Sequence, residues 1–183
     1  MLAFYISIID NPNDKEKFTS LYEKYKDHMY KVAFSILRNN ENAEDAVQNS
    51  FLRIIKNFSL FDNVFCEKTR RLIVIISKQC AIEIYRKVKT ASEFSENIEP
   101  DFDIASEYNL ENDVLSNANR ERIYNFIKNL PATYKDVIRL RFVEDYSNDE
   151  IAKILGITKT NVETRVTRGK AMLASAISRE ESL

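Results

Sequence analysis

Apolar residues recur at helical spacing along the first third of the chain. The first stripe has three- and four-residue steps and consists of Phe18, Leu21, Tyr22, Tyr25, Met29, Val32, Ala33 and Ile36. A second stripe consists of Val47, Phe51, Ile54, Ile55 and Phe58. Each stripe predicts a helix that turns one face toward a core. Asn42 offers an N-cap for the second helix, and Glu44 and Asp45 then place negative charge in its first turn, where the helix dipole favours it.

The run from Leu72 to Ile76 fits two kinds of element. Its five consecutive branched apolar residues are compatible with a buried strand or with the buried part of a helix. Apolar positions continue through Ala81, Ile82 and Tyr85 without Gly or Pro. This continuation favours the helix.

Near the C-terminus, the pattern predicts three helices with sharp connections. Pro131 can stand in the first turn of a helix that carries Val137, Ile138 and Leu140. Ser147 and Glu150 have capping-box spacing, and a short apolar face then stops at Gly156. Thr158 can cap a further helix, whose apolar back consists of Val162, Val166, Gly169 and Leu173. Helix, glycine-containing turn and second helix form the pattern of a helix-turn-helix.

Composition supports an all-α protein with two small helical domains. Gly occurs twice and Pro three times among 183 residues, which is scarce for a protein of many tight turns. No apolar run approaches the roughly twenty residues that span a bilayer, so we expect a soluble, cytoplasmic protein. Cys66, Cys80 and His28 cannot supply the four ligands of a structural zinc site. We therefore expect free, buried thiols and neither metal nor cofactor.

Charge divides the chain, although its formal net charge is only −1. Between 91 and 119 there is no Lys or Arg, and the acidic residues are Glu93, Glu96, Glu99, Asp101, Asp103, Glu107, Glu111 and Asp113. The preceding stretch, 66–90, is basic. This predicts a domain over 1–90, a flexible acidic linker over 91–119 and a helix-turn-helix domain over 120–183.

The second helix of the helix-turn-helix has a front that suits DNA. A helix in the major groove needs short polar side chains that approach the bases closely, and cations that meet phosphates or guanine. Residues of these types are Thr160, Asn161, Thr164, Arg165, Arg168 and Lys170. The alternative is a solvated helix in a plain bundle.

Three stretches resemble the sigma-70 family, and especially its extracytoplasmic-function (ECF) group. LPATYKDVIRLRFVEDYSNDEIAKILGITKTNVETRVTRGKAML, from Leu130 to Leu173, looks like the family's fourth region. NAEDAVQNSFL, from Asn42 to Leu52, resembles its second region, and SKQCAIEIYR, from Ser77 to Arg86, resembles the helix that follows. The resemblance implies an alternative sigma factor, whose first domain binds RNA polymerase and opens the −10 element while its second domain reads the −35 element.

The resemblance also assigns residues to each partner. Those expected to face the polymerase clamp are Asp45, Gln48, Asn49 and Phe51. Those expected near −10 DNA are Lys68, Arg70, Arg71, Lys78, Gln79, Glu83, Arg86 and Lys87. Those expected at the −35 element are Thr160, Asn161, Thr164, Arg165, Thr167, Arg168 and Lys170.

Several of these assignments have alternatives. The helix dipole alone can account for Asp45, and Arg165 can instead pack along the flank of its helix. In the stretch Asn57–Arg71, which resembles the loop that captures an unstacked base, burial is favoured over stacking for Phe58 and Phe61. Departures from the family pattern at Leu72, Gln79 and Glu163 leave the preferred bases open.

The implied partners are core RNA polymerase, through its β′ clamp and β flap, and promoter DNA. The resemblance further implies an anti-sigma factor, which in this group is often membrane-anchored, and no small-molecule substrate. One His and no glycine-rich phosphate loop argue against an enzyme. The rival hypotheses are an ordinary helix-turn-helix regulator, which binds DNA unaided as a symmetric dimer, and a helical adaptor that does not touch DNA. The acidic linker is either solvated disorder or, by resemblance, a strand that threads the polymerase's nucleic-acid channel.

Overall fold

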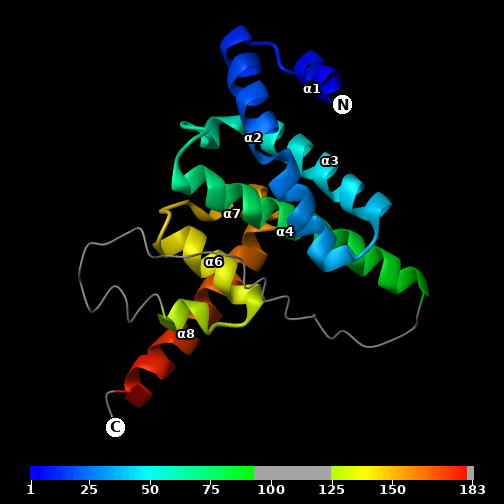
Figure 1. Cartoon of the computed structure of the whole chain (residues 1–183). Helices are drawn as coiled ribbons and strands as arrows, with labels where there is room; N and C mark the ends of the chain where they lie inside the picture. The colour runs from blue at the N-terminus through cyan, green and yellow to red at the C-terminus, as the bar shows by residue number, and fades with distance from the viewer. Residues whose placement is uncertain (93–124, 181–183) are drawn as a thin grey trace. The chain divides into compact units, whose positions relative to one another are not determined.

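The computed structural model describes residues 1–92 and 125–180, which belong to two separate compact units (Figure 1). Within the described ranges the ordered elements are all helices, which confirms the all-α prediction. No helix in these ranges is long and apolar enough to cross a membrane. The predicted acidic linker lies outside the described residues, except for 91 and 92, which continue a helix.

The first unit is built around three long helices. The elements are α1 (Leu2–Ile8), α2 (Pro12–Leu37), α3 (Asn40–Lys56), the 3-10 helix η1 (Phe58–Leu60) and α4 (Glu67–Ser92). Helices α2, α3 and α4 pack against one another, and α1 lies on α2 and α3. The predicted stripe of α2 forms the core: every member is buried except Tyr22, which is half-buried.

Asparagines cap α2 and α3. The side chain of Asn11 accepts a hydrogen bond from the Asn13 N–H, with Pro12 in the first turn of α2. Helix α3 is capped by Asn39, whose Oδ1 lies 2.9 Å from the Asn42 nitrogen. The predicted cap at Asn42 is therefore wrong by three residues. Asp45 then lies beyond the first turn of α3, so the dipole alone does not account for it.

Helix α4 resolves the ambiguity of the 72–76 run. It is one continuous helix of 26 residues, and all five residues from Leu72 to Ile76 are buried. Burial extends over more than one helix face because α4 packs against both α2 and α3. A helix enclosed in this way loses its polar stripe, which is why the sequence also fitted a strand.

The second unit contains a helical turn at 125–128 and the helices α6 (Ala132–Phe142), α7 (Asn148–Leu155) and α8 (Lys159–Glu180). Both α6 and α7 pack on α8. One buried cluster joins Ile127, Leu130 and Ile138, with Leu173 packed against it. Helix α8 approaches α6 closely at Gly169, where an added Cβ would stand 2.6 Å from Ile138 Cγ1. The predicted apolar back of α8 thus faces the core.

Candidate nucleic-acid interface

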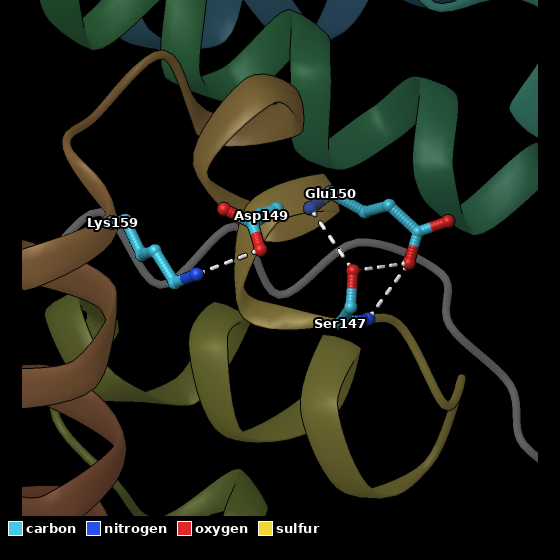
Figure 2. A network of polar contacts seen from close by, with 4 residues as sticks. All are labelled: Ser147, Asp149, Glu150 and Lys159. Carbon is cyan, nitrogen blue, oxygen red and sulfur yellow. Dashed lines mark hydrogen bonds and ion pairs between the residues drawn. The ribbon is translucent and has the colours of Figure 1, made fainter.

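The capping box predicted at the start of α7 is present (Figure 2). Ser147 Oγ accepts from the Glu150 N–H at 3.3 Å, and Glu150 Oε2 accepts from the Ser147 N–H at 2.8 Å. At the other end of α7, Gly156 has a φ of 68°, the left-handed conformation that glycine adopts without steric cost. Both ends of the short helix are therefore fixed by local chemistry.

The turn after α7 sets the start of α8. Thr158 Oγ1 accepts from the Asn161 N–H at 3.2 Å, which confirms the predicted cap. Lys159 reaches back from the start of α8 to Asp149 on α7, with 2.9 Å between Nζ and Oδ2 (Figure 2). The hydrogen bond with Asp149 raises the pKa of Lys159. Together these contacts join α7 and α8 into a helix-turn-helix with a defined first turn.

Helix α8 separates an apolar back from a polar front. On the back, Val162 is fully buried and Gly169 is buried, while Val166 and Leu173 are half-buried. Residues of the predicted −35 set that are exposed on α8 are Thr160, Asn161, Thr164, Thr167, Arg168 and Lys170. An exposed polar face at the start of the second helix is the arrangement with which such motifs enter the major groove.

Arg165 is the exception in the −35 set. Its side chain is half-buried. Its Nε donates to Asn161 Oδ1 at 2.7 Å, and its Nη1 lies 3.5 Å from the carbonyl oxygen of Thr133 in the first turn of α6. The side chain therefore lies along the flank of α8 toward α6. This is the position that the alternative interpretation, flank packing instead of base contact, predicted. Lys170 also turns sideways, with Nζ 5.0 Å from the centre of the Phe142 ring.

Basic side chains flank α4 at both ends. Lys68, near its start, and Arg86 and Lys87, near its end, are exposed, while Arg70, Arg71 and Gln79 are half-buried. Lys78 departs from the predicted −10 set, because it is only 8 % exposed. The middle of α4 is enclosed by α2 and α3, so an open DNA-facing position for Lys78 is wrong.

Glu83, also predicted near −10 DNA, has a partner within the unit. Arg53 Nη2, on α3, donates to both of its carboxylate oxygens, at 2.9 and 3.1 Å. Burial by itself would lower the pKa of Arg53, but the hydrogen bond with Glu83 raises it. The pair links α3 to α4. Arg53 gives no local signal in the sequence because its partner lies 30 positions away.

The predicted polymerase face of α3 loses one member. Asp45 and Asn49 are exposed and Gln48 is half-exposed, but Phe51 is fully buried. Its ring centre lies 4.8 Å from that of Tyr22. The assignment of Phe51 to a surface is therefore wrong, because it belongs to the aromatic core between α2 and α3.

The loop before α4 presents one exposed aromatic ring. Phe61 is fully buried and Phe58 half-buried, whereas Phe65 is 69 % exposed. The Tyr25 hydroxyl donates to the Val64 carbonyl at 2.9 Å, and Lys24 Nζ stands 4.4 Å from the centre of the Phe65 ring. Burial is thus confirmed for Phe61 and only in part for Phe58. Lys24 and Tyr25 were missed as loop contacts, although a buried Tyr hydroxyl calls for a partner.

A helix-turn-helix unit and a second helical unit with basic ends on one long helix define a DNA-binding protein with two separate parts. Comparison with known families makes the class specific. The family described as "Sigma-70 region 2" matches residues 21–89, and "Sigma-70, region 4" matches residues 120–173. The chain belongs to the sigma-70 family, in its ECF group.

Curated relatives agree along most of their length. The "ECF RNA polymerase sigma factor SigX" of Bacillus subtilis (strain 168) is 27% identical, covering 87% of this chain and 82% of its own. "ECF RNA polymerase sigma factor SigW" of the same organism is 29% identical, covering 87% and 88%. The "ECF RNA polymerase sigma-E factor" of Haemophilus influenzae is 26% identical, covering 90% and 89%.

The solved structures to which the chain is similar include one complex. It is described as "Structure of CnrH in complex with the cytosolic domain of CnrY", with 19% identity, 97% of this chain and 95% of that chain covered, and a TM-score of 0.37.

As a member of its family, the present chain is a promoter-specific transcription initiation factor that binds core RNA polymerase and promoter DNA, and it is not an enzyme.

Proposed function

We propose that the two units divide the work of initiation as the resemblance to the sigma-70 family implies, and the charge pattern agrees with this division. Residues 1–90 bind the β′ clamp of core polymerase and contact the −10 element. Residues 120–183 contact the β flap and read the −35 element through α8. Residues 91–119 connect them. The single observation that carries this proposal is the helix-turn-helix itself, with its buried back and its exposed polar front on α8.

The polymerase contact is assigned to the outer face of α3. Asp45, Gln48 and Asn49 lie within one helical turn and leave their side chains wholly or partly open to solvent. Helix α3's opposite side is occupied by the core. This face can therefore bind a partner without disturbing the unit.

The −10 contact is assigned to the exposed ring of Phe65 and to the cations around α4. An exposed aromatic ring can stack on an unpaired base. Lys24, which contacts the ring of Phe65, and Lys68, three residues after it, can contact phosphates. Arg86 and Lys87 extend the basic surface at the far end of α4. Lys78 has no part in this surface because it is buried.

We also propose a protein partner that holds the factor inactive, an anti-sigma factor that can be membrane-anchored. Membership of the ECF group supports it. The factor itself is expected to work in the cytoplasm, where its polymerase is.

Substitution of Arg168 tests the −35 contact. Arg168→Ala removes an exposed cation from the front of α8 and leaves its apolar back intact. With core polymerase present, loss of a base contact should lower the affinity for a promoter fragment about 5- to 150-fold. Loss of a phosphate contact should instead reduce the slope of log affinity against log salt concentration by about one. Fluorescence anisotropy at several salt concentrations measures both.

Arg179→Ala is the matched control, because Arg179 is exposed on the same helix about 16 Å farther on, beyond the start that enters the groove. It is expected to bind as the unchanged chain does. Unchanged affinity and unchanged salt dependence in Arg168→Ala would remove Arg168 from the interface.

A further inference from the structure

The front of α8 is dominated by hydrogen-bond acceptors. Its central stripe consists of Thr160, Glu163, Thr164 and Thr167, which follow the i, i+3, i+4, i+7 spacing of one helix face. All four are exposed. We call this set the α8 stripe.

Two of the threonines use their donors within the helix. The Thr164 hydroxyl donates to the Thr160 carbonyl at 2.9 Å, and the Thr167 hydroxyl donates to the Glu163 carbonyl at 2.9 Å. What these side chains turn outward is a methyl group and oxygen lone pairs. The carboxylate of Glu163, which only accepts when ionised, belongs to the same face of α8.

Three neighbouring cations make their hydrogen bonds or ring contacts outside the α8 stripe, although the charge of Glu163, after the hydrogen bond and charge of Asp149, also helps to raise the pKa of Lys159. Lys159 pairs with Asp149, Arg165 donates to Asn161 and lies toward α6, and Lys170 lies over Phe142. Within the described residues Glu163 makes no hydrogen bond or ion pair through its carboxylate. A carboxylate on the DNA-facing side is repelled by phosphates, and a base that supplies a hydrogen-bond donor can compensate this repulsion.

Major-groove chemistry selects that base. Guanine presents two acceptors, N7 and O6, and thymine presents the O4 acceptor, so both repel a carboxylate. Adenine offers the N6 donor beside the N7 acceptor, whereas cytosine offers its N4 donor without an adjacent acceptor. We propose that Glu163 is a specificity-determining residue, whose carboxylate accepts a hydrogen bond from the N4 amino group of a cytosine in the −35 element. This inference rests on the proposed function of α8.

The test is a selection from DNA with a randomised −35 region, using the full chain assembled with core polymerase. We expect the selected DNA to carry cytosine at one position. A promoter with guanine at that position should bind about 5- to 150-fold more weakly. Glu163→Gln should move the preference at that same position to adenine, because Gln pairs with N6 and N7 of adenine. Glu163→Arg should move it to guanine, since Arg pairs with O6 and N7.

Asp145→Asn is the control, because it removes the same charge from an exposed site of the same unit that lies outside α8. Asp145 has a φ of 64°, a left-handed conformation that Asn tolerates. The control should leave every preference unchanged. The opposed shifts expected of the Gln and Arg variants cannot arise from partial unfolding, which would weaken all sequences alike.

Two other results would overturn the inference in distinguishable ways. If the chain selects promoters with polymerase but neither Glu163 variant changes any base preference, the role of Glu163 is refuted and the proposed function stands. If no sequence is selected with polymerase, the proposed function fails and the inference fails with it.

Discussion

The two cysteines of the first unit have different environments. Cys66 is half-buried just before α4, and Cys80 is buried within it. Burial opposes ionisation of Cys66, but hydrogen bonds with the side chain and N–H of Thr69 outweigh it and lower the pKa of this thiol below its ordinary value. Burial raises the pKa of the Cys80 thiol. The thiolate is the reactive form, so the two should differ in reactivity.

We expect iodoacetamide at neutral pH to alkylate Cys66 and to leave Cys80 unmodified in the folded chain. Mass spectrometry of peptides over time measures both rates. Because the pKa of Cys66 is lowered, its rate should fall at a lower pH than that of an ordinary thiol as the solution is acidified. Cys66→Ser should abolish the fast modification, and equal rates at the two thiols would contradict the assignment.

Gly169 permits the close contact of α8 with α6. Alanine favours a helix over glycine by about 1 kcal/mol, but its Cβ would stand 2.6 and 2.7 Å from Cγ1 and Cδ1 of the fully buried Ile138. Overpacking costs about 1–3 kcal/mol, so we expect Gly169→Ala to lower the midpoint of thermal unfolding of the second unit.

Calorimetry of the full chain measures the effect. Ile138→Ala removes both Cγ1 and Cδ1 from the facing side chain, so the double variant should lose less stability than the two single changes together. Additive effects in the double variant would show that the Gly169–Ile138 contact does not limit the packing.

At the scale of elements, α3 and α4 are joined by one ion pair as well as by their apolar faces. The side chain of Arg53 is 18% exposed and that of Glu83 is 38% exposed. This is a partly buried pair, whose rupture leaves one charge poorly solvated. The pair thus links α3, which carries the proposed polymerase contact, to α4, which carries proposed −10 contacts.

Arg53→Ala should lower the free energy of unfolding by about 1–3 kcal/mol, the cost of removing one partner of a hydrogen-bonded charge that water still partly reaches. Urea denaturation followed by circular dichroism measures it. Lys26→Ala is the control, since Lys26 pairs with Glu23 at an exposed site of α2 and should have little effect. No loss of stability in Arg53→Ala would mean that packing alone joins the two helices.

Helices and caps could be predicted from the sequence where the residues that define them lie within a few positions of one another. The stripe of α2, the capping box at Ser147 and the Thr158 cap follow from spacing within a few residues, and all were predicted correctly. The cap of α3 was misplaced because asparagines stand at 39, 40 and 42, and only Asn39 has the extended backbone of a cap while the other two lie within the helix.

Burial of particular side chains required knowledge of neighbouring helices. Phe51 and Lys78 were assigned to surfaces by resemblance, but both are buried in the first unit, and Phe51 packs against aromatic rings of α1 and α2. Similarly, the lateral contact of Arg165 with Thr133 joins residues 32 positions apart. Such contacts leave no local signal in the sequence.

At the scale of the whole molecule, segments of opposite charge give a net charge near zero. The basic residues of α4 and α8, which we propose to contact DNA, are offset in the sum by the acidic stretch at 91–119. Promoter recognition at two elements then requires both units in one chain. An ordinary helix-turn-helix regulator would need only the second.

Run-off transcription from a promoter library tests this most directly. Core polymerase is compared alone, with the full chain, and with a chain lacking residues 120–183. We predict initiation that depends on the full chain, at promoters sharing a −35 and a −10 element, and its loss or strong reduction with the truncated chain. Absence of initiation, together with binding of the purified chain to a palindromic site by itself, would contradict the sigma-factor function and indicate an ordinary regulator.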